Sequence, residues 1–231
     1  MEIHGFNKTT LLDYPEHVAA TVFTGGCNFR CPFCHNASLV LCPQDCPVIP
    51  ENEVLEYLKK RQGVLEGVCI TGGEPTLQKD LREFICKLKG MGYLVKLDTN
   101  GYRPEVLRSL LEEGLIDYVA MDVKASPANY ARATGCRKID ISRIKESVSV
   151  LKNCEIPYEF RTTVVKGIHC VEEFEEIGRM LSGCPAYYLQ AYRDSGNIIS
   201  EGYTDYPVQV MREMAERARK YIDKVELRGV E

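Results

Sequence analysis

Short runs of β-branched and aromatic residues alternate along the chain with segments in which apolar residues recur at helical spacing. Six runs are candidate strands, and they lie at residues 19–23, 68–70, 94–97, 118–121, 160–165 and 187–189. Strands that alternate with helices in this way are typical of repeated βα units, whose strands pair in parallel within one sheet. The pattern therefore predicts an α/β protein.

Five segments have the apolar spacing of helices that would cover such a sheet. They lie at about residues 77–88, 106–111, 141–151, 174–181 and 211–222. Pro104 and Gly114 stand on either side of the second segment, as expected for a helix that starts at proline and ends before glycine. Six βα units are fewer than the eight of a closed barrel, so we expect a partial, open (β/α)6 barrel of parallel strands.

The length of the chain predicts its domain organisation. A chain of 231 residues can bury one sizeable core but is short for two average domains. We find no repeat of fixed period and no linker of distinct composition. We expect a single domain over residues 1–231, with the barrel at about residues 16–195 and a C-terminal helix at about residues 207–223.

The near balance of basic and acidic residues argues against nucleic acids and membranes as partners. Because 29 basic residues stand against 33 acidic ones, no cationic field would gather a phosphate backbone or an anionic membrane. The first residues do not resemble a secretion signal, and no run approaches the ~18 apolar residues that span a bilayer. We expect a cytoplasmic protein without a nucleic-acid or membrane partner.

Eleven cysteines are too many, and odd in number, for a complete set of disulfides. In a reducing compartment, clustered cysteines are typical of metal sites or catalytic groups. Four of the thiols lie in or beside apolar stretches and are expected to be small buried hydrophobic groups; they are Cys69, Cys86, Cys154 and Cys170. Five thiols form a cluster in the sequence, at Cys27, Cys31, Cys34, Cys42 and Cys46.

The first three thiols of the cluster stand at a Cys-x3-Cys-x2-Cys spacing and admit three interpretations. A structural zinc site would need a fourth ligand, which Cys42 or Cys46 could supply. The string from Cys31 to His35 also matches the Cys-x-x-Cys-His attachment signature of c-type haem. A third interpretation is an iron–sulfur cluster, which normally has four cysteine ligands and here lacks one nearby.

The third interpretation is supported by a resemblance. The spacing of the three cysteines, with Phe33 just before the last, resembles the signature of the radical S-adenosylmethionine superfamily. The resemblance implies that Cys27, Cys31 and Cys34 bind three irons of a [4Fe-4S] cluster, while S-adenosylmethionine chelates the fourth. It also implies that Phe33, Cys34 and His35 lie beside that cofactor. An open coordination position is the mark of a catalytic metal centre.

Polar or glycine-rich strings follow the next strands at the edge where active sites of parallel sheets form. The string from Gly72 to Pro75 ends the second strand, where a glycine pair permits close backbone approach to a ligand. With the cysteines, Gly72-Gly73-Glu74-Pro75 resembles the superfamily's second signature. The resemblance implies that Gly72, Gly73 and Glu74 contact the methionine amino group.

Two further strand ends extend the resemblance to activating enzymes of glycyl radical enzymes, across most of residues 1–195. The strings are Asp98-Thr99-Asn100-Gly101 and Asp122-Val123-Lys124. Asp122 and Lys124 project to one face of a strand and can reach the same ligand. The resemblance implies that Asp98 and Asp122 lie near the methionine moiety and that Lys124 contacts the cofactor carboxylate or ribose. We take these three as candidate catalytic residues, with Thr99, Asn100 and Val123 as further cofactor contacts. The alternative is a solvated Asp and Lys at a strand end.

The fifth and sixth strands carry three more candidates. By the same resemblance Arg161 points inward and Val165 lies beside the adenine, although an inward Arg could also make a structural ion pair. Arg193 follows the sixth strand and takes the position of a histidine in activases of the pyruvate formate-lyase type. It is kept as a candidate cofactor contact.

The strings Lys8-Thr9-Thr10-Leu11-Leu12-Asp13-Tyr14-Pro15 and Cys34-His35-Asn36 most resemble activating proteins of anaerobic ribonucleoside-triphosphate reductase. The resemblance implies that a reduced cluster passes one electron to S-adenosylmethionine, and that the resulting 5′-deoxyadenosyl radical removes hydrogen from a glycine Cα of a partner protein. A flavodoxin- or ferredoxin-type protein would supply the electron.

Two other functions stay open. The protein could be a radical S-adenosylmethionine enzyme that acts on a small molecule, such as a deazapurine precursor, or a non-catalytic iron–sulfur or zinc protein. Cys42 and Cys46 are expected not to be ligands, because two additional clusters would need eight more cysteines and the segment between Cys34 and Val68 holds two. A redox role for the pair remains an alternative.

Overall fold

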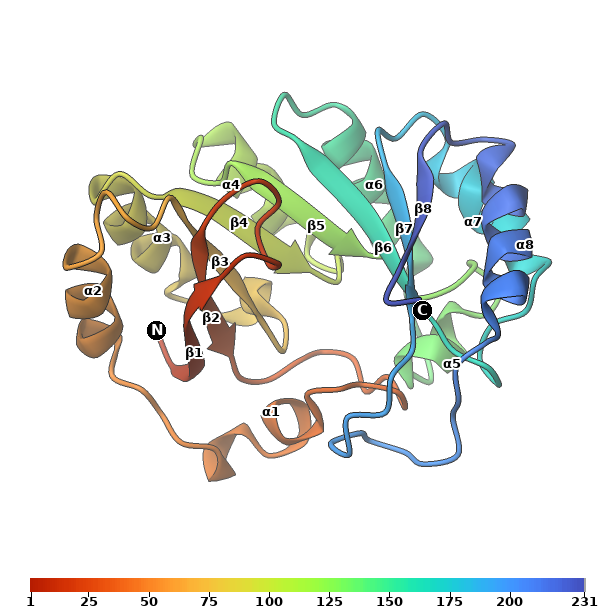
Figure 1. The fold of residues 1–231 in the computed structure, drawn as a ribbon, viewed down its shortest axis with the longest axis horizontal. Helices are drawn as coiled ribbons and strands as arrows, with labels where there is room; N and C mark the ends of the chain where they lie inside the picture. Colours follow the sequence, from red (N-terminus) through yellow and green to blue (C-terminus); the bar gives the residue numbers. More distant parts are fainter. Residues whose placement is uncertain (231) are drawn as a thin grey trace.

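The fold is one curved sheet of eight strands in the order β1 to β8 (Figure 1). A computed structural model describes residues 1–230. The strands are β1 Ile3–Thr10, β2 Ala19–Thr24, β3 Gly67–Gly72, β4 Leu94–Thr99, β5 Tyr118–Asp122, β6 Tyr158–Val164, β7 Tyr187–Ala191 and β8 Val225–Arg228. β1 pairs antiparallel with β2, and all other neighbours are parallel. The prediction of an open α/β sheet with parallel strands is confirmed.

Two strands lie outside the predicted set. The six predicted strands are β2 to β7, and β1 and β8 extend the sheet by one strand at each edge, beyond the expected limits of 16–195. β1 contains His4, Asn7 and Lys8 and is largely exposed, because it is an edge strand, so it has no apolar run. β8 has four residues, too few for a periodic pattern.

Helices lie mainly on the outer face of the sheet (Figure 1). Their bounds are α1 Ala37–Leu41, α2 Glu51–Lys59, α3 Leu81–Gly90, α4 Pro104–Glu112, α5 Tyr130–Thr134, α6 Ile141–Lys152, α7 Glu173–Leu181 and α8 Val208–Arg219, with 3₁₀ turns η1 Pro43–Asp45 and η2 Pro75–Leu77. The five predicted helices are α3, α4, α6, α7 and α8. Leu77 belongs to η2 rather than to α3, and α8 ends before the predicted residue 223.

The apolar residues at helical spacing that predicted the helices lie in the core. In α3, for example, Leu81, Phe84, Ile85 and Leu88 are all buried against the sheet. Burial of each such side chain contributes about 1.5–3 kcal/mol. The same helical period turns Cys86 outward, and Cys86 is exposed, so the prediction that it is buried is wrong.

The other three thiols expected to be buried differ among themselves. Cys170, in the loop before α7, is exposed, so that prediction is also wrong. Cys69 is buried in β3, as predicted, and Cys154 is partly buried. All eleven cysteines are free thiols.

The loops at the carboxyl ends of β2 to β7 converge, and α1 and α5 lie at this end (Figure 1). The long loop after β7, residues 192–207, crosses to the loop after β2. There Ser200 N donates to Pro32 O at 2.8 Å, and Ala37 N donates to Asn197 O at 3.3 Å. The loop after β7 thus packs against the loop after β2. Within residues 1–230 no helix is long and apolar enough to cross a membrane.

Candidate functional site

A cavity of about 790 Å³, including solvent at its mouth, lies at the carboxyl end of the sheet. It is lined by residues from the carboxyl-terminal halves of β3, β4, β5 and β6 and from the loops after β2, β3, β4 and β5. The predicted site residues that line it are Cys27, Cys31, Phe33, Cys34, His35, Gly72, Gly73, Glu74, Asp98, Thr99, Asn100, Asp122, Lys124 and Arg161. Most of the residues selected from the sequence therefore share one cavity.

The cysteine loop, residues 27–34, is held by backbone hydrogen bonds from both sides. Just before it, Gly26 N donates to Leu39 O at 2.7 Å, and within it Arg30 N donates to Thr134 O at 2.8 Å. Gly135 caps α5 in the left-handed conformation (φ 65°), and a Cβ there would lie 2.9 Å from the Arg30 carbonyl carbon. α1 and α5 thus fix a loop that has no regular structure of its own.

Burial sets the protonation of the thiols. It raises the pKa of the Cys27 thiol to about 11, with a further contribution from the Glu74 carboxylate. Burial also raises the pKa of Cys31 to about 12, against the opposing effect of the Lys124 ammonium. These thiols are therefore protonated in the metal-free protein, and metal binding must release their protons.

The arrangement of the three thiols bears on which metal they could hold. Within residues 1–230 no three His, Cys, Asp or Glu side chains converge on a single ion position. A structural zinc site requires such convergence, because its ligands share one ion at about 2.0–2.3 Å. In a cubane each thiolate binds a different iron, so three thiols around one cavity suffice.

The glycine pair at the end of β3 lines the cavity, and its lack of side chains also lets it pack against backbone. A Cβ on Gly73 would overlap the Gly26 carbonyl and lie 2.7 Å from its carbon, and one on Gly72 would lie 2.5 Å from Thr24 O. Glu74 N also donates to Gly26 O at 2.8 Å. The absence of side chains at residues 72 and 73 thus lets the end of β3 lie directly against the start of the cysteine loop.

Glu74 is buried and connects the ends of β3 and β4. Its Oε1 accepts from Thr76 N at 3.1 Å, Thr76 Oγ1 at 2.5 Å and Thr99 Oγ1 at 2.7 Å, and its Oε2 accepts from Asn100 N at 2.7 Å. Burial raises the pKa of this carboxyl, while these donors oppose the rise. Because each carboxylate oxygen offers about two acceptor sites and Oε2 accepts one bond from the protein, Oε2 keeps capacity for one further donor.

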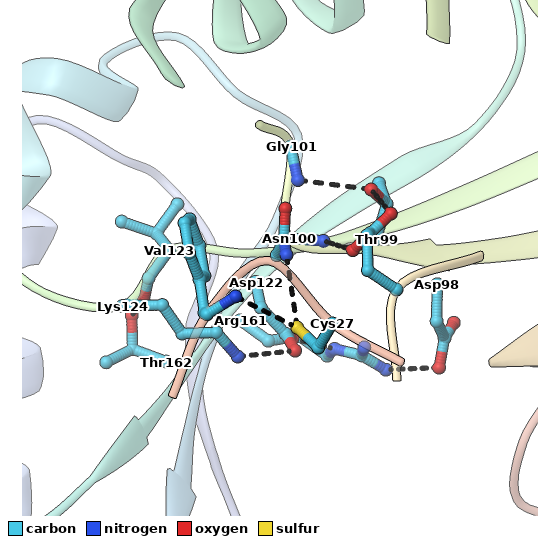
Figure 2. A network of polar contacts seen from close by, with 12 residues as sticks. Cys27, Asp98, Thr99, Asn100, Gly101, Asp122, Val123, Lys124, Arg161 and Thr162 are labelled. Atoms are coloured by element: carbon cyan, nitrogen blue, oxygen red, sulfur yellow. Dashed lines mark hydrogen bonds and ion pairs between the residues drawn. The ribbon is translucent and has the colours of Figure 1, made fainter. Parts of the chain in front are cut away.

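Asn100 reaches from the end of β4 to the cysteine loop (Figure 2). Its Nδ2 lies 3.7 Å from Cys27 Sγ and donates to Asn28 Oδ1 at 2.8 Å. Its Oδ1 accepts from Tyr102 N at 2.9 Å. The sequence predicted Asn100 as a cofactor contact, and the structure gives it an additional role in holding the first cysteine.

Five charged side chains of alternating sign cross the inner face of β4, β5 and β6; they are Lys96, Asp98, Arg161, Asp122 and Lys124 (Figure 2 shows the last four). Lys96 Nζ donates to Asp98. Arg161 binds Asp98 at 3.3 Å and Asp122 at 2.9 Å, and Lys124 binds Asp122 at 3.0 Å. Three cations and two anions leave this charge network with a net charge of +1.

The network holds Asp122 and Lys124 in the charged form. Burial alone would raise the pKa of Asp122, but Arg161 and Lys124 outweigh it and the pKa is well below its usual range. The pKa of Lys124 is raised, because Asp122 outweighs the effect of burial. Arg161 makes the kind of ion pair that was given as the alternative to a cofactor contact, and it lines the cavity as well. Asp122 and Lys124 are partly buried rather than simply solvated.

Three candidates do not line the cavity. Val123 and Val165 are fully buried behind it. Arg193 is exposed and its Nη2 donates to Gly229 O at 3.3 Å. Their cofactor contacts remain predictions. The string at residues 8–15 also lies elsewhere, since Thr10 pairs with Ala19 at the opposite end of β2 from the cysteine loop.

Several residues of the site were missed in the sequence. Lys96 alternates with Val95 and Leu97 in β4 and shares the inner face with Asp98, so strand periodicity could have found it. Asn36 Nδ2 donates to Gly72 O at 3.0 Å and joins the cysteine loop to the glycine pair. It stands in the string Cys34-His35-Asn36 that carries part of the family resemblance, but no role in the site was predicted for it.

Comparison with known proteins agrees with this geometry. A model described as "Radical SAM superfamily" matches residues 21–181. A protein of Methanocaldococcus jannaschii named "Putative glycyl-radical enzyme activating enzyme" is 33% identical over 238 residues, covering 99% of this chain and 96% of that protein. The GTP 3',8-cyclase of Helicobacter pylori is 32% identical over 182 residues, covering 76% of this chain and 53% of the cyclase.

Solved structures give the same fold. Streptococcus suis SuiB bound to S-adenosylmethionine has a TM-score of 0.69 at 15% identity, covering 89% of this chain and 49% of SuiB. The chain thus spans about half the length of SuiB, and at this identity the likeness concerns the fold alone. The family model covers more than half of the chain and contains the three cysteines and the glycine pair. The protein therefore belongs to the radical S-adenosylmethionine superfamily.

Proposed function

We propose that this protein is an activating enzyme that generates a glycyl radical on a partner enzyme. The observation that carries the proposal is the similarity of 99% of the chain to 96% of the Methanocaldococcus jannaschii protein named as such an activator. The similarity to the cyclase, by contrast, covers 53% of the cyclase. We further propose that residues 1–231 act as one domain.

Members of this superfamily use a [4Fe-4S] cluster and S-adenosylmethionine, and the residues of the cavity fit both. Three thiols and no fourth cysteine line the cavity, so Cys27, Cys31 and Cys34 would hold three irons and leave the fourth open. When bound, the cluster and S-adenosylmethionine together supply a 5′-deoxyadenosyl radical. The protein's own part is to bind, orient and exclude water.

The charge network matches the methionine end of S-adenosylmethionine. Its net charge of +1 and the Lys124 ammonium favour a carboxylate in the cavity. The free acceptor site of Glu74 suits an ammonium group. In this proposal Asp98 and Asp122 orient Arg161 and Lys124, and Asn100 holds the loop of Cys27.

We propose an acidic one-electron carrier of the flavodoxin or ferredoxin type as the electron donor. Arg30, Arg132, Arg137 and Lys138 are exposed and form what is here named the basic rim, on the cysteine loop and on α5 with the turn after it. Arg30 and α5 are in contact through the bond from Arg30 N to Thr134 O. Arg30 also donates to Cys27 O, so a carrier on this rim would lie close to a predicted iron ligand.

The proposed protein substrate is anaerobic ribonucleoside-triphosphate reductase, supported by the strings at residues 8–15 and 34–36. The test is to reconstitute the cluster anaerobically, add S-adenosylmethionine, a reductant and the reductase, and measure 5′-deoxyadenosine and the electron paramagnetic resonance doublet of a glycyl radical. The expected result is both products. Cleavage of S-adenosylmethionine without a glycyl radical on any candidate enzyme would refute the activating function but not the family.

A second candidate function is a reaction on a small molecule, favoured by the similarity of 76% of the chain to the cyclase. It predicts turnover of GTP or a deazapurine precursor without a protein partner. Metal analysis separates both from a non-catalytic zinc protein: about four Fe and four sulfide per chain are expected for one cluster. The same measurement on Cys42→Ser and Cys46→Ser should give unchanged iron if these two thiols are not ligands.

A further inference from the structure

His169 lies in the loop between β6 and α7 and is 3% exposed. It does not line the cavity and was not selected from the sequence. Its ring nevertheless contacts segments that carry three of the predicted cofactor contacts, namely Phe33, Lys124 and Val165. A buried polar side chain with such contacts calls for a structural explanation.

Both ring nitrogens of His169 have backbone partners that fix their roles. Val165 N–H donates to Nδ1 at 3.0 Å, so Nδ1 is an acceptor. Nε2 lies 2.8 Å from the Lys124 carbonyl oxygen, which can only accept, so Nε2 carries the proton. The imidazole is therefore the neutral Nε2–H tautomer. Burial, which lowers its pKa, is consistent with this state.

The bond to Lys124 extends the pairing of β5 with β6 past the end of the sheet. The last backbone bond between them runs from Val123 N to Arg161 O at 2.8 Å. Beyond it, side chains replace backbone donors: Thr162 Oγ1 donates to Val123 O at 2.7 Å, and His169 donates to Lys124 O. Without His169, the carbonyl oxygen of Lys124 has no such donor at the point where β5 and β6 diverge.

The ring also reaches the cysteine loop. Phe33, which precedes the ligand Cys34, meets the His169 ring edge to face with centroids 6.3 Å apart. On the other side Phe174 of α7 lies with its centroid 6.0 Å away. The imidazole is thus fixed between α7 and the cysteine loop, and its position is set by the core of the domain.

We propose that His169 is a positioning residue for S-adenosylmethionine binding, which holds the Lys124 peptide, the Val165 amide and the Phe33 ring in one arrangement. The proposal rests on binding of S-adenosylmethionine in the cavity and not on the identity of the final substrate. Its expected consequence is that loss of the bond to Lys124 weakens cofactor affinity while the fold and the cluster are retained.

Two substitutions of His169 test its two ring hydrogen bonds one at a time. His169→Gln can keep a donor near the Nε2 position, and His169→Asn can keep an acceptor near the Nδ1 position but is too short to reach Lys124. The matched control is Tyr206→Phe, which removes the 2.8 Å bond from Tyr206 Oη to the His169 backbone carbonyl and leaves the ring untouched. Circular dichroism and iron content establish that each variant is folded and loaded.

The first measurement is the Kd of reconstituted protein for S-adenosylmethionine, by anaerobic equilibrium dialysis. We expect His169→Asn to raise Kd about tenfold, the effect of leaving one buried acceptor without a donor, and His169→Gln to remain within about threefold of the wild type. Tyr206→Phe should leave Kd unchanged. Equal weakening by Tyr206→Phe and His169→Asn, or no weakening by His169→Asn, would overturn the proposal.

The second measurement needs neither cluster nor cofactor. In metal-free protein, ¹⁵N chemical shifts of the His169 ring should report the neutral Nε2–H tautomer, and the Val165 amide should be protected from hydrogen exchange in the wild type and in His169→Asn. An Nδ1–H tautomer would refute the positioning role directly. Failure to detect a glycyl radical on a partner would refute the proposed function and leave both of these results standing.

Discussion

Gly73→Ala tests whether close packing of the end of β3 against the cysteine loop is needed for stability and for activity. The new Cβ would overlap the Gly26 carbonyl oxygen and stand 2.7 Å from its carbon. Gly73 has no positive φ, so alanine can adopt its backbone conformation and the cost is steric. The obstructing atoms belong to the backbone just before Cys27, so relief of the overlap must move either the cysteine loop or the peptide that precedes Glu74.

The size of the effect follows from overpacking. Extra methyl groups in well-packed sites cost about 1–3 kcal/mol. With an m-value of about 2–3 kcal/mol/M in urea, the midpoint of unfolding should fall by roughly 0.3–1.5 M. The displacement between Glu74 and Cys27 should reduce cleavage of S-adenosylmethionine by more than the loss of stability alone would, because a shift of about 1 Å at reacting groups costs about 10²-fold.

The assay compares Gly73→Ala with Gly90→Ala. A Cβ on Gly90, at the end of α3, would meet nothing within 4 Å, so this control should be neutral or slightly stabilising. Urea unfolding of metal-free protein, iron and sulfide content, and 5′-deoxyadenosine formation are measured for both. Wild-type stability and activity in Gly73→Ala would show that the glycine pair is not required for packing against the cysteine loop.

Three further predictions concern the thiols, the charge network and the basic rim. Cys31→Ala should lose most of the iron and sulfide that the wild type binds, measured after anaerobic reconstitution; retention of about four Fe would exclude Cys31 as a ligand. Because Arg161 and Lys124 lower the pKa of Asp122 below its unfolded value, the carboxylate stabilises the fold fully at neutral pH, and this contribution declines as the pH falls below about 4. Urea unfolding of wild type and Asp122→Asn should therefore differ by a constant amount above about pH 5, and the difference should shrink steadily as the pH falls below about 4; a difference independent of pH would contradict the ion pairs. Charge reversal of Arg137 and Lys138 to Glu should slow cluster reduction by reduced flavodoxin about tenfold at low salt but leave reduction by dithionite unchanged; equal effects with both reductants would refute donor docking on the rim.

Much of the fold could be predicted because strands β2 to β7 and helices α3, α4, α6, α7 and α8 have clear apolar periods. The carboxyl edge of a parallel sheet then brings the loops after successive strands together, so the cysteines, Glu74 and Lys124 could be assigned to one site without coordinates. The edge strands could not, because β1 is polar and β8 short.

The roles of single residues within the site were harder to predict. The glycine pair was expected to let backbone approach a ligand, and it also packs against the backbone of Thr24 and Gly26, a contact between segments far apart in the chain that sequence spacing does not encode. Asp98 and Asp122 were expected beside the cofactor, and each also engages Arg161. His169 lies outside every motif, and its importance emerges only from the partners of its two ring nitrogens.

The strand order has a consequence for how the protein matures. Neighbouring strands are also consecutive in the chain, so the sheet can grow from β1 to β8 as the chain leaves the ribosome. The cysteine loop, however, gains its contacts with Thr134 and with the segment of Asn197 and Ser200 much later in synthesis. The predicted iron ligands are thus translated early but immobilised late, and we expect iron to be inserted into an essentially finished chain.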